Sequence, residues 1–201
     1  MSSLSIRKDE LLWRKHKCEW DACQKCAIGR IAHKHVHARG QIPADTMFLG
    51  LAPGKTEDVI GWPFIGLAGK ILNSAINEVM EDTTGPSTYC VANLLACRPT
   101  DWLGSPNRDP TELELENCQP RWHALIKLVS PSLIVLLGEL ATREFLATYR
   151  NKSGKDMFWF SLAHPAWIVR TGGLYGKTFK VWLEEMKTGF RERGVNHVKT
   201  R

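Results

Sequence analysis

Apolar and polar positions follow two periods along this chain, and from residue 46 onward the two periods alternate. Short runs that are almost entirely apolar predict buried strands, whereas longer stretches with an apolar residue every three or four positions predict amphipathic helices. The predicted strands cover Thr46–Leu51, Tyr89–Leu95, Leu133–Leu137 and Phe158–Leu162.

Helical patterns separate and follow these strands. They cover Glu10–Lys17, Ala68–Val79, Thr111–Val129, Glu139–Ala147 and Tyr175–Arg191. Pro120 is expected to kink or divide the third of them, because proline lacks the amide that a helix interior needs. The last helix places its large apolar side chains on one face, which predicts core packing: Phe179, Trp182, Leu183, Met186 and Phe190.

Four strands joined by helical crossovers predict an α/β fold. We expect one domain, with a four-stranded parallel sheet flanked by helices on both faces. Ligands of such sheets bind at the carboxyl ends of the strands. The loops most relevant to function therefore begin at Leu51, Leu94, Gly138 and Ala163.

Residues 1–45 look different from the rest. They are basic and mostly irregular and include the histidine-rich stretch AHKHVHARG, so we interpret them as an N-terminal segment preceding an α/β domain of residues 46–201. The chain has a formal net charge of +6, which suits a polyanionic partner but does not require one. The histidine-rich stretch and the basic tail HVKTR either add to a grip on such a partner or are solvated surface.

The sequence predicts a soluble, cytoplasmic protein with no membrane span. No apolar run reaches the length of a span, and the start MSSLSIRKDELLWRKHKC lacks the apolar centre of a signal peptide. In a reducing compartment the six cysteines are expected to be thiols or metal ligands rather than disulfides.

The spacing of four of these cysteines indicates a metal site. Cys23 and Cys26 form a C-x-x-C pair, and Cys97 and Cys118 are isolated further along the chain. Four thiolates can enclose either zinc or an iron–sulfur cluster, and the spacing does not choose between them. The two remaining cysteines, at positions 18 and 90, are interpreted as ordinary packed thiols.

Polar residues follow the predicted strands at the places where a site is expected. After the first strand, Glu57 and Asp58 are candidates for a base that activates water, or for a helix cap or a solvated acid pair. Phe64 is either a stacking platform or a core residue. Asn93 offers an acceptor and a donor together, as the reading of a nucleobase edge requires, or forms a turn. His164 can donate a hydrogen bond to a developing oxyanion, or is a buried structural histidine.

Together these segments resemble the motifs of the family 4 uracil-DNA glycosylases. The resemblance runs in order from Cys23 to Arg170, through GLAPGKTED…GWPFIGLAGKIL, VANLLACRPT…NRDPTELELENCQP, LIVLLGELA and HPAWIVR. It implies a parallel four-stranded sheet between helices and an enzyme that hydrolyses the N-glycosidic bond of uracil in DNA. It also implies a structural [4Fe–4S] cluster on four cysteines, which map to Cys23, Cys26, Cys97 and Cys118.

The resemblance also implies roles for single residues. Glu57 falls on the family's catalytic acid, and His164 on its second-motif histidine, which acts on the leaving uracil. Phe64 falls on the uracil-stacking phenylalanine and Asn93 on the base-reading asparagine. The remaining predicted substrate contacts are Ala52 in the opening loop and Arg170 as a phosphate contact. A monomer acting on uracil-containing DNA is expected.

Two departures from the family pattern leave alternatives open. Leu51 stands where family 4 members usually have glutamate, and the related family 5 enzymes carry Gly-Leu-Ala-Pro there. The chain is therefore a uracil-DNA glycosylase, a glycosylase with another base preference, or a weak or inactive nucleic-acid-binding relative. A redox or electron-transfer role is disfavoured, because it would need none of the candidate residues. The insertion DWLGS at residues 101–105 either touches DNA or is a tolerated surface insertion.

Overall fold

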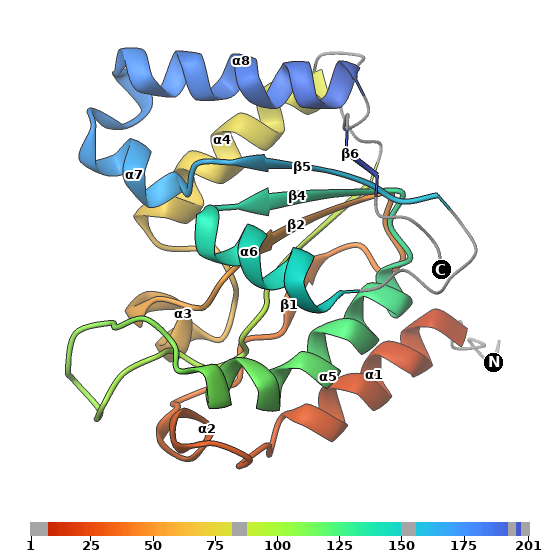
Figure 1. Cartoon of the computed structure of the whole chain (residues 1–201), viewed down its shortest axis with the longest axis vertical. Helices are drawn as coiled ribbons and strands as arrows, with labels where there is room; N and C mark the ends of the chain where they lie inside the picture. The colour runs from red at the N-terminus through yellow and green to blue at the C-terminus, as the bar shows by residue number, and fades with distance from the viewer. Residues whose placement is uncertain (1–7, 82–87, 150–155, 193–195, 198–201) are drawn as a thin grey trace, which may run out of the picture.

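The computed structural model describes residues 8–81, 88–149, 156–192 and 196–197. Residues 198–201, which form most of the basic tail HVKTR, lie outside these ranges. Within the described ranges no helix is long and apolar enough to span a membrane. The chain folds around one mixed sheet (Figure 1).

The sheet has six strands in the described part of the chain, in the order β1-β3-β2-β4-β5-β6. Its centre is parallel and consists of β3 (Tyr89–Asn93), β2 (Thr46–Gly50), β4 (Leu133–Leu137) and β5 (Phe158–Leu162). These are the four predicted strands, so the predicted parallel sheet is confirmed. The antiparallel edge strands β1 (Ala38–Gly40) and β6 (Asn196–His197) were not predicted. At three and two residues they are too short to show a periodic pattern.

The five predicted helices are present, with ends that differ by a few residues. They are α1 (Lys8–Trp20), α4 (Leu67–Glu81), α5 (Glu112–Val129), α6 (Glu139–Thr148) and α8 (Lys177–Arg191). The short helices α2 (Ala27–Ile31), α3 (Lys55–Ile60) and α7 (Pro165–Arg170) were missed. Pro120 lies inside a single α5, so the expected division does not occur.

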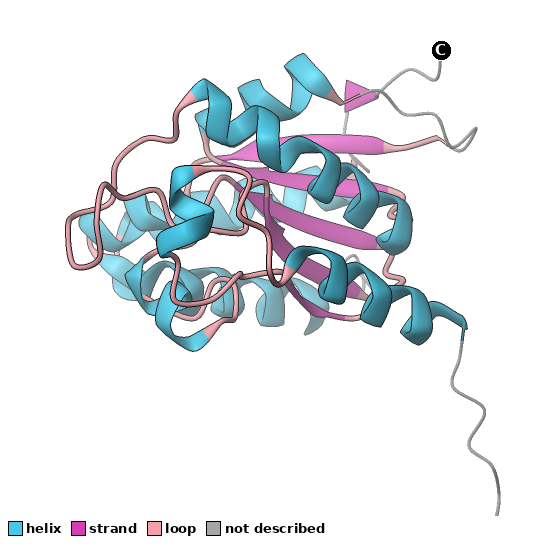
Figure 2. Ribbon diagram, turned by 90° about the horizontal axis from the view of Figure 1, so that it is seen from below, coloured by secondary structure: helices cyan, strands magenta, loops and turns pink. Residues whose placement is uncertain are grey.

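Helices cover both faces of the sheet (Figures 1 and 2), and an apolar layer lies between the helices and the sheet on each face. Alternation along β2 creates the two layers: Phe48 faces the layer that contains α4 and α8, whereas Met47 and Leu49 face the layer that contains α5 and α6. The predicted apolar face of α8 is confirmed, since all five of its large side chains are buried. This packing fixes the carboxyl ends of the parallel strands at one edge of the sheet.

From residue 8 onward the N-terminal segment is an integral part of this fold, because it contains α1, α2 and β1. Its strand β1 pairs with β3, and α1 contacts α5. On α1, His16 is only 4 % exposed and stacks on Trp13 with ring centroids 5.7 Å apart. Burial, together with the nearby charges of Arg121 and His37, lowers the pKa of His16 from 6.5 to about 4.

This buried histidine predicts a loss of stability in acid. Unfolding exposes His16 to water, so below pH 6.5 the unfolded chain binds a proton that the folded chain excludes. The stabilisation is fully present above pH 6.5 and falls as the pH approaches about 4, by up to about 3 kcal/mol. Urea unfolding of wild type and His16→Phe at pH 7 and pH 5 measures it. The variant should lose less unfolding free energy than wild type, and equal losses would contradict the prediction.

Candidate active site

The candidate site lies where the carboxyl ends of β2 and β3 meet. Gly50 and Asn93 are register partners, and the amide of Leu94 donates to the Gly50 carbonyl at 2.9 Å. A Cβ atom at position 50 would lie 2.5 Å from the Phe64 ring and 2.6 Å from Asn93 Oδ1. Only glycine therefore allows Phe64 and Asn93 to converge over the end of β2.

Asn93 is 1 % exposed, and within the described residues its Oδ1 accepts no hydrogen bond. A buried acceptor without a donor costs about 1–3 kcal/mol, so such atoms are rare outside functional sites. Arg121 fixes the main chain at the end of β3, because it donates to the carbonyls of Asn93 at 2.6 Å and Leu94 at 2.8 Å. The site thus offers one unpaired amide oxygen on a fixed strand end.

Phe64 is held in a backbone conformation that L-residues rarely adopt, with φ at 53°. Arg39 on β1 stabilises it by donating to the carbonyls of Pro63 at 2.8 Å and Phe64 at 3.4 Å. At Gly69 on α4 the backbone passes so close that a Cβ would lie 1.9 Å from the Phe64 carbonyl oxygen. The Phe64 ring is 5 % exposed, and its centroid lies 5.9 Å from that of His164.

Glu57 lies on α3, the short helix that the sequence did not predict, and is 9 % exposed. Its Oε1 accepts from the amides of Ile65 at 2.9 Å and Gly66 at 2.7 Å. Oε2 faces Gly54, where a Cβ would lie only 2.8 Å away. Two backbone donors on one oxygen fix the orientation of the carboxylate, and the absence of side chains at Gly54 and Gly66 keeps space around it.

Asp58 has a different task from the one expected. It is 2 % exposed, and its two oxygens accept from His33, from the amide at 3.1 Å and from Nδ1 at 2.7 Å. The interpretation of Asp58 as a cap is wrong, because Gly54 caps α3 without a side-chain bond. Asp58 instead ties the N-terminal segment to the helix that carries Glu57.

His164 caps the N-terminus of α7, where its Nδ1 accepts from the Ala166 amide at 3.2 Å. The ring proton of the neutral form is therefore on Nε2, which is a donor. Burial and then the charge of Arg170 lower the pKa of His164, and Glu57 partly offsets them. At neutral pH His164 is thus an uncharged hydrogen-bond donor.

The remaining predicted substrate residues lie at the edge of this group. Arg170 is exposed in the last turn of α7. Ala52 is half-buried and packs against the apolar cluster around Cys97 and Leu95. The structure thus brings Glu57, Phe64, Asn93 and His164 together.

The four predicted ligand cysteines line one cavity: Cys23, Cys26, Cys97 and Cys118. Burial raises the pKa of the Cys26 and Cys97 thiols, and the charges of the neighbouring cysteines raise both further. Because a charged cluster or metal would reverse this preference and hold the thiols as thiolates, the donor set suits such a group. Within the described residues no three histidine, cysteine or acidic side chains are grouped closely enough to hold a single metal ion.

The other two cysteines have different surroundings. Cys90 is a buried thiol, and burial raises its pKa to about 12, as expected for an ordinary packed thiol. Cys18 is exposed on α1, so its interpretation as a packed thiol is wrong. Neither lines the cavity of the four cysteines.

Three arginines support the site in ways that the sequence did not predict. Arg121 is 1 % exposed and also donates from Nε to Cys118 Sγ at 3.4 Å, so it joins the cysteine cavity to the end of β3. Arg39 supports Phe64, and Arg98 donates to Asn107 Oδ1 at 2.5 Å. A single arginine produces no periodic pattern in a sequence. The partners of these three arginines include main-chain carbonyls and the side-chain amide of Asn107, and only the fold brings these partners close. The one available hint was position, because Arg98 follows a predicted cysteine ligand.

Comparison with known proteins agrees with this geometry. Residues 37–187 match the model of the uracil DNA glycosylase superfamily. The chain is 38 % identical over 179 residues to the type-4 uracil-DNA glycosylase of Saccharolobus solfataricus, covering 81 % of this chain and 77 % of that one. It is 30 % identical over 211 residues to the type-4 enzyme of Sulfurisphaera tokodaii, covering 97 % of this chain and 86 % of that one. The resemblance found in the sequence is confirmed: the chain belongs to the uracil DNA glycosylase superfamily, in its type-4 branch.

Proposed function

We propose that this chain is a DNA repair glycosylase that flips uracil out of DNA and hydrolyses its N-glycosidic bond, leaving an abasic site. The observation that carries the proposal is the unpaired, buried Oδ1 of Asn93 beside Phe64. Uracil presents an N–H donor next to a carbonyl acceptor, and an asparagine amide matches that pair. Flipping the nucleotide costs a few kcal/mol, which stacking on Phe64 and pairing with Asn93 would offset.

Hydrolysis needs a water molecule and a group that stabilises positive charge on the sugar. Glu57 serves both needs, because its Oε1 is fixed by the Ile65 and Gly66 amides while Oε2 holds the water. Bond cleavage builds oxocarbenium-like charge, as in glycoside hydrolysis, and the nearby carboxylate stabilises it. The water proton passes to Glu57 as the oxygen bonds to the sugar carbon.

The departing uracil carries the electrons of the broken bond as an anion. His164 donates from Nε2 to the ring oxygen on which that charge develops, since Nδ1 already accepts from Ala166. The lowered pKa of His164 keeps the ring neutral, so it stabilises the anion by hydrogen bonding without first transferring a proton.

Cys23, Cys26, Cys97 and Cys118 line one cavity and supply the four thiolates that a [4Fe–4S] cluster takes. When bound it would link the N-terminal segment, through Cys23 and Cys26, to Cys97 in the loop after β3 and to Cys118 on α5. The hydrolysis has no redox step, so this role is structural. All the residues named come from one chain, and a monomer suffices.

Incubating the protein with an oligonucleotide that carries one uracil tests the function directly. Uracil release leaves an alkali-labile site at that position. Oligonucleotides with hypoxanthine or xanthine test the alternative base preference that Leu51 leaves open. DNA binding without any alkali-labile product from these substrates would support the inactive nucleic-acid-binding relative instead.

The affinity for DNA is expected to fall steeply as the salt concentration rises. Arg170 is exposed beside the site, and each phosphate that a cation neutralises adds about 0.9 to the negative slope of log affinity against log salt on duplex DNA. Arg170→Gln should therefore weaken binding and flatten the slope by about 1. Arg14→Gln, which changes an exposed arginine on α1, is the matched control and should leave the slope unchanged. A slope near zero for wild type would contradict a phosphate-based grip.

A further inference from the structure

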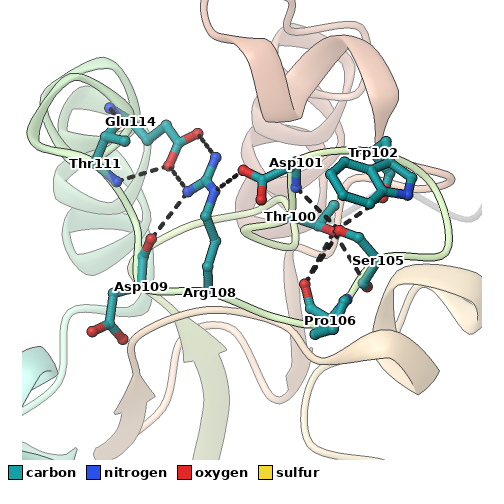
Figure 3. Close-up of polar contacts among 9 residues, drawn as sticks. All are labelled: Thr100, Asp101, Trp102, Ser105, Pro106, Arg108, Asp109, Thr111 and Glu114. Atoms are coloured by element: carbon teal, nitrogen blue, oxygen red, sulfur yellow. Dashed lines mark hydrogen bonds and ion pairs between the residues drawn. The ribbon is translucent and has the colours of Figure 1, made fainter.

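The insertion at residues 101–105 belongs to a loop that the structure fixes from within. We name residues 99–110 the braced loop. Thr100 Oγ1 and Ser105 Oγ lie 2.5 Å apart, and Thr100 also donates to the Trp102 carbonyl at 3.0 Å (Figure 3). The Ser105 amide donates to the same carbonyl at 3.1 Å, and Gly104 between them has a φ of 94°. The turn is therefore closed by its own short side chains and by one glycine.

The base of the braced loop is held as firmly. Arg108 forms a two-pronged ion pair with Glu114, at 2.8 and 2.7 Å, and donates to Asp101 at 2.8 Å (Figure 3). The Thr111–Glu114 capping box places that glutamate at the start of α5. Arg98, buried next to Cys97, donates to the Ser105 carbonyl. Because the loop is already ordered, it loses little further conformational entropy when a ligand binds.

Two exposed apolar side chains lie at the tip of the braced loop. Trp102 is 64 % exposed and Leu103 is 54 % exposed, so neither contributes much to the core. A tolerated surface insertion needs no such bracing and gains nothing from an exposed tryptophan. A large exposed apolar side chain on a rigid support is instead typical of a contact site.

The loop's position identifies its partner. It protrudes at the edge to which the arrowheads of β2 and β4 point, the edge that also holds α3 and α7 (Figure 1). At its base, Asn107 Nδ2 lies 3.9 Å from the place where a Gly54 Cβ would stand, directly before the helix that carries Glu57. A DNA strand that presents a nucleotide to Asn93 must therefore pass this edge.

The loop's charge indicates which part of DNA it contacts. Its one cation, Arg108, is neutralised by Glu114 and Asp101, and Asp109 adds a further negative charge. Phosphates are therefore poor ligands for this loop, whereas an aromatic ring stacks on any base. Resting on the proposed function, we propose that Trp102, backed by Leu103, stacks on a base of the DNA strand beside the flipped nucleotide.

Binding of a duplex with a tetrahydrofuran abasic analogue tests this inference without hydrolysis. Trp102→Ala should lower affinity about 5- to 150-fold, the usual worth of one stacked base, and leave the salt slope unchanged. Trp102→Phe should retain most of the affinity. Leu103→Ala should weaken binding less, and Leu11→Ala, an equally exposed leucine on α1, should not weaken it. Because both tip residues are exposed, thermal midpoints should match wild type.

The outcomes separate this inference from the proposed function. If wild type releases uracil and Trp102→Ala binds as tightly as wild type, the stacking contact is wrong. A salt slope that flattens by about 1 in Trp102→Ala would also overturn stacking in favour of a phosphate contact. If wild type neither binds the duplex nor releases uracil, the proposed function itself fails.

Discussion

Glu57→Gln lowers the single-turnover rate of uracil release by roughly 10²–10⁴-fold, the usual worth of a positioned acid–base group. The amide keeps the shape of the side chain and its acceptor oxygen, so the bonds from Ile65 and Gly66 can persist. It cannot accept the proton of water or stabilise positive charge on the sugar. DNA affinity should change little, because a carboxylate contacts no phosphate. Quenched-flow assays with excess enzyme measure release, and a parallel titration measures binding.

Asp58→Asn is the matched control, since it changes the adjacent acid in the same way. Its two oxygens hold His33, so its loss should weaken the attachment of the N-terminal segment more than the chemical step. We expect a lower thermal midpoint with residual release well above that of Glu57→Gln. Near-normal release by Glu57→Gln together with a folded, inactive Asp58→Asn would reverse the assignment of the base.

Cys97→Ser abolishes iron binding and with it the stability of the fold around residues 23–26 and 118. Anaerobically purified wild type should be brown and contain about four irons per chain. Replacing one of four thiolates in a buried cavity leaves the other three without their common partner, so we expect loss of the cluster and a markedly lower thermal midpoint. Iron analysis and absorption spectra measure the first effect, and thermal unfolding measures the second.

Cys90→Ser and Cys18→Ser are the controls and should leave the iron content unchanged. Cys90 is as buried as Cys97 and therefore tests the effect of a buried substitution alone, whereas Cys18 tests an exposed one. Loss of iron in either would show that the ligand set is misassigned. Stoichiometric zinc without broad visible absorption would replace the iron–sulfur assignment and keep the same four ligands.

The parallel sheet was predictable because its strands are buried on both faces and read as continuous apolar runs. Leu133–Leu137 matches the observed strand at both ends for this reason. The helices α3 and α7 were missed because six residues give less than two turns, too few for a period. The edge strand β1 exists only through its pairing with β3, and Gly40 within it gives no strand signal.

For the site, motif order gave the positions of Glu57, Phe64, Asn93 and His164, and the fold brings them together. The resemblance assigned the catalytic acid to Glu57, but the residues alone did not distinguish it from Asp58, because that difference depends on His33, a residue 25 positions from Asp58. The support given by Arg39 and Arg121 was hidden for the same reason. Both donate to main-chain carbonyls, which every residue possesses and no motif records.

The pairing of β1 with β3 has a consequence for the order in which the chain folds as it leaves the ribosome. Residues 38–40 can complete their hydrogen bonds only after residues 90–92 have been synthesised, about fifty positions later. Until then Arg39 cannot hold the Phe64 backbone from β1, although both residues have already been synthesised. His164 is synthesised later still, because it follows the last parallel strand as the N-cap of α7. A nascent chain therefore carries the acid long before the base-reading and leaving-group residues, and binds no flipped base until synthesis is nearly finished.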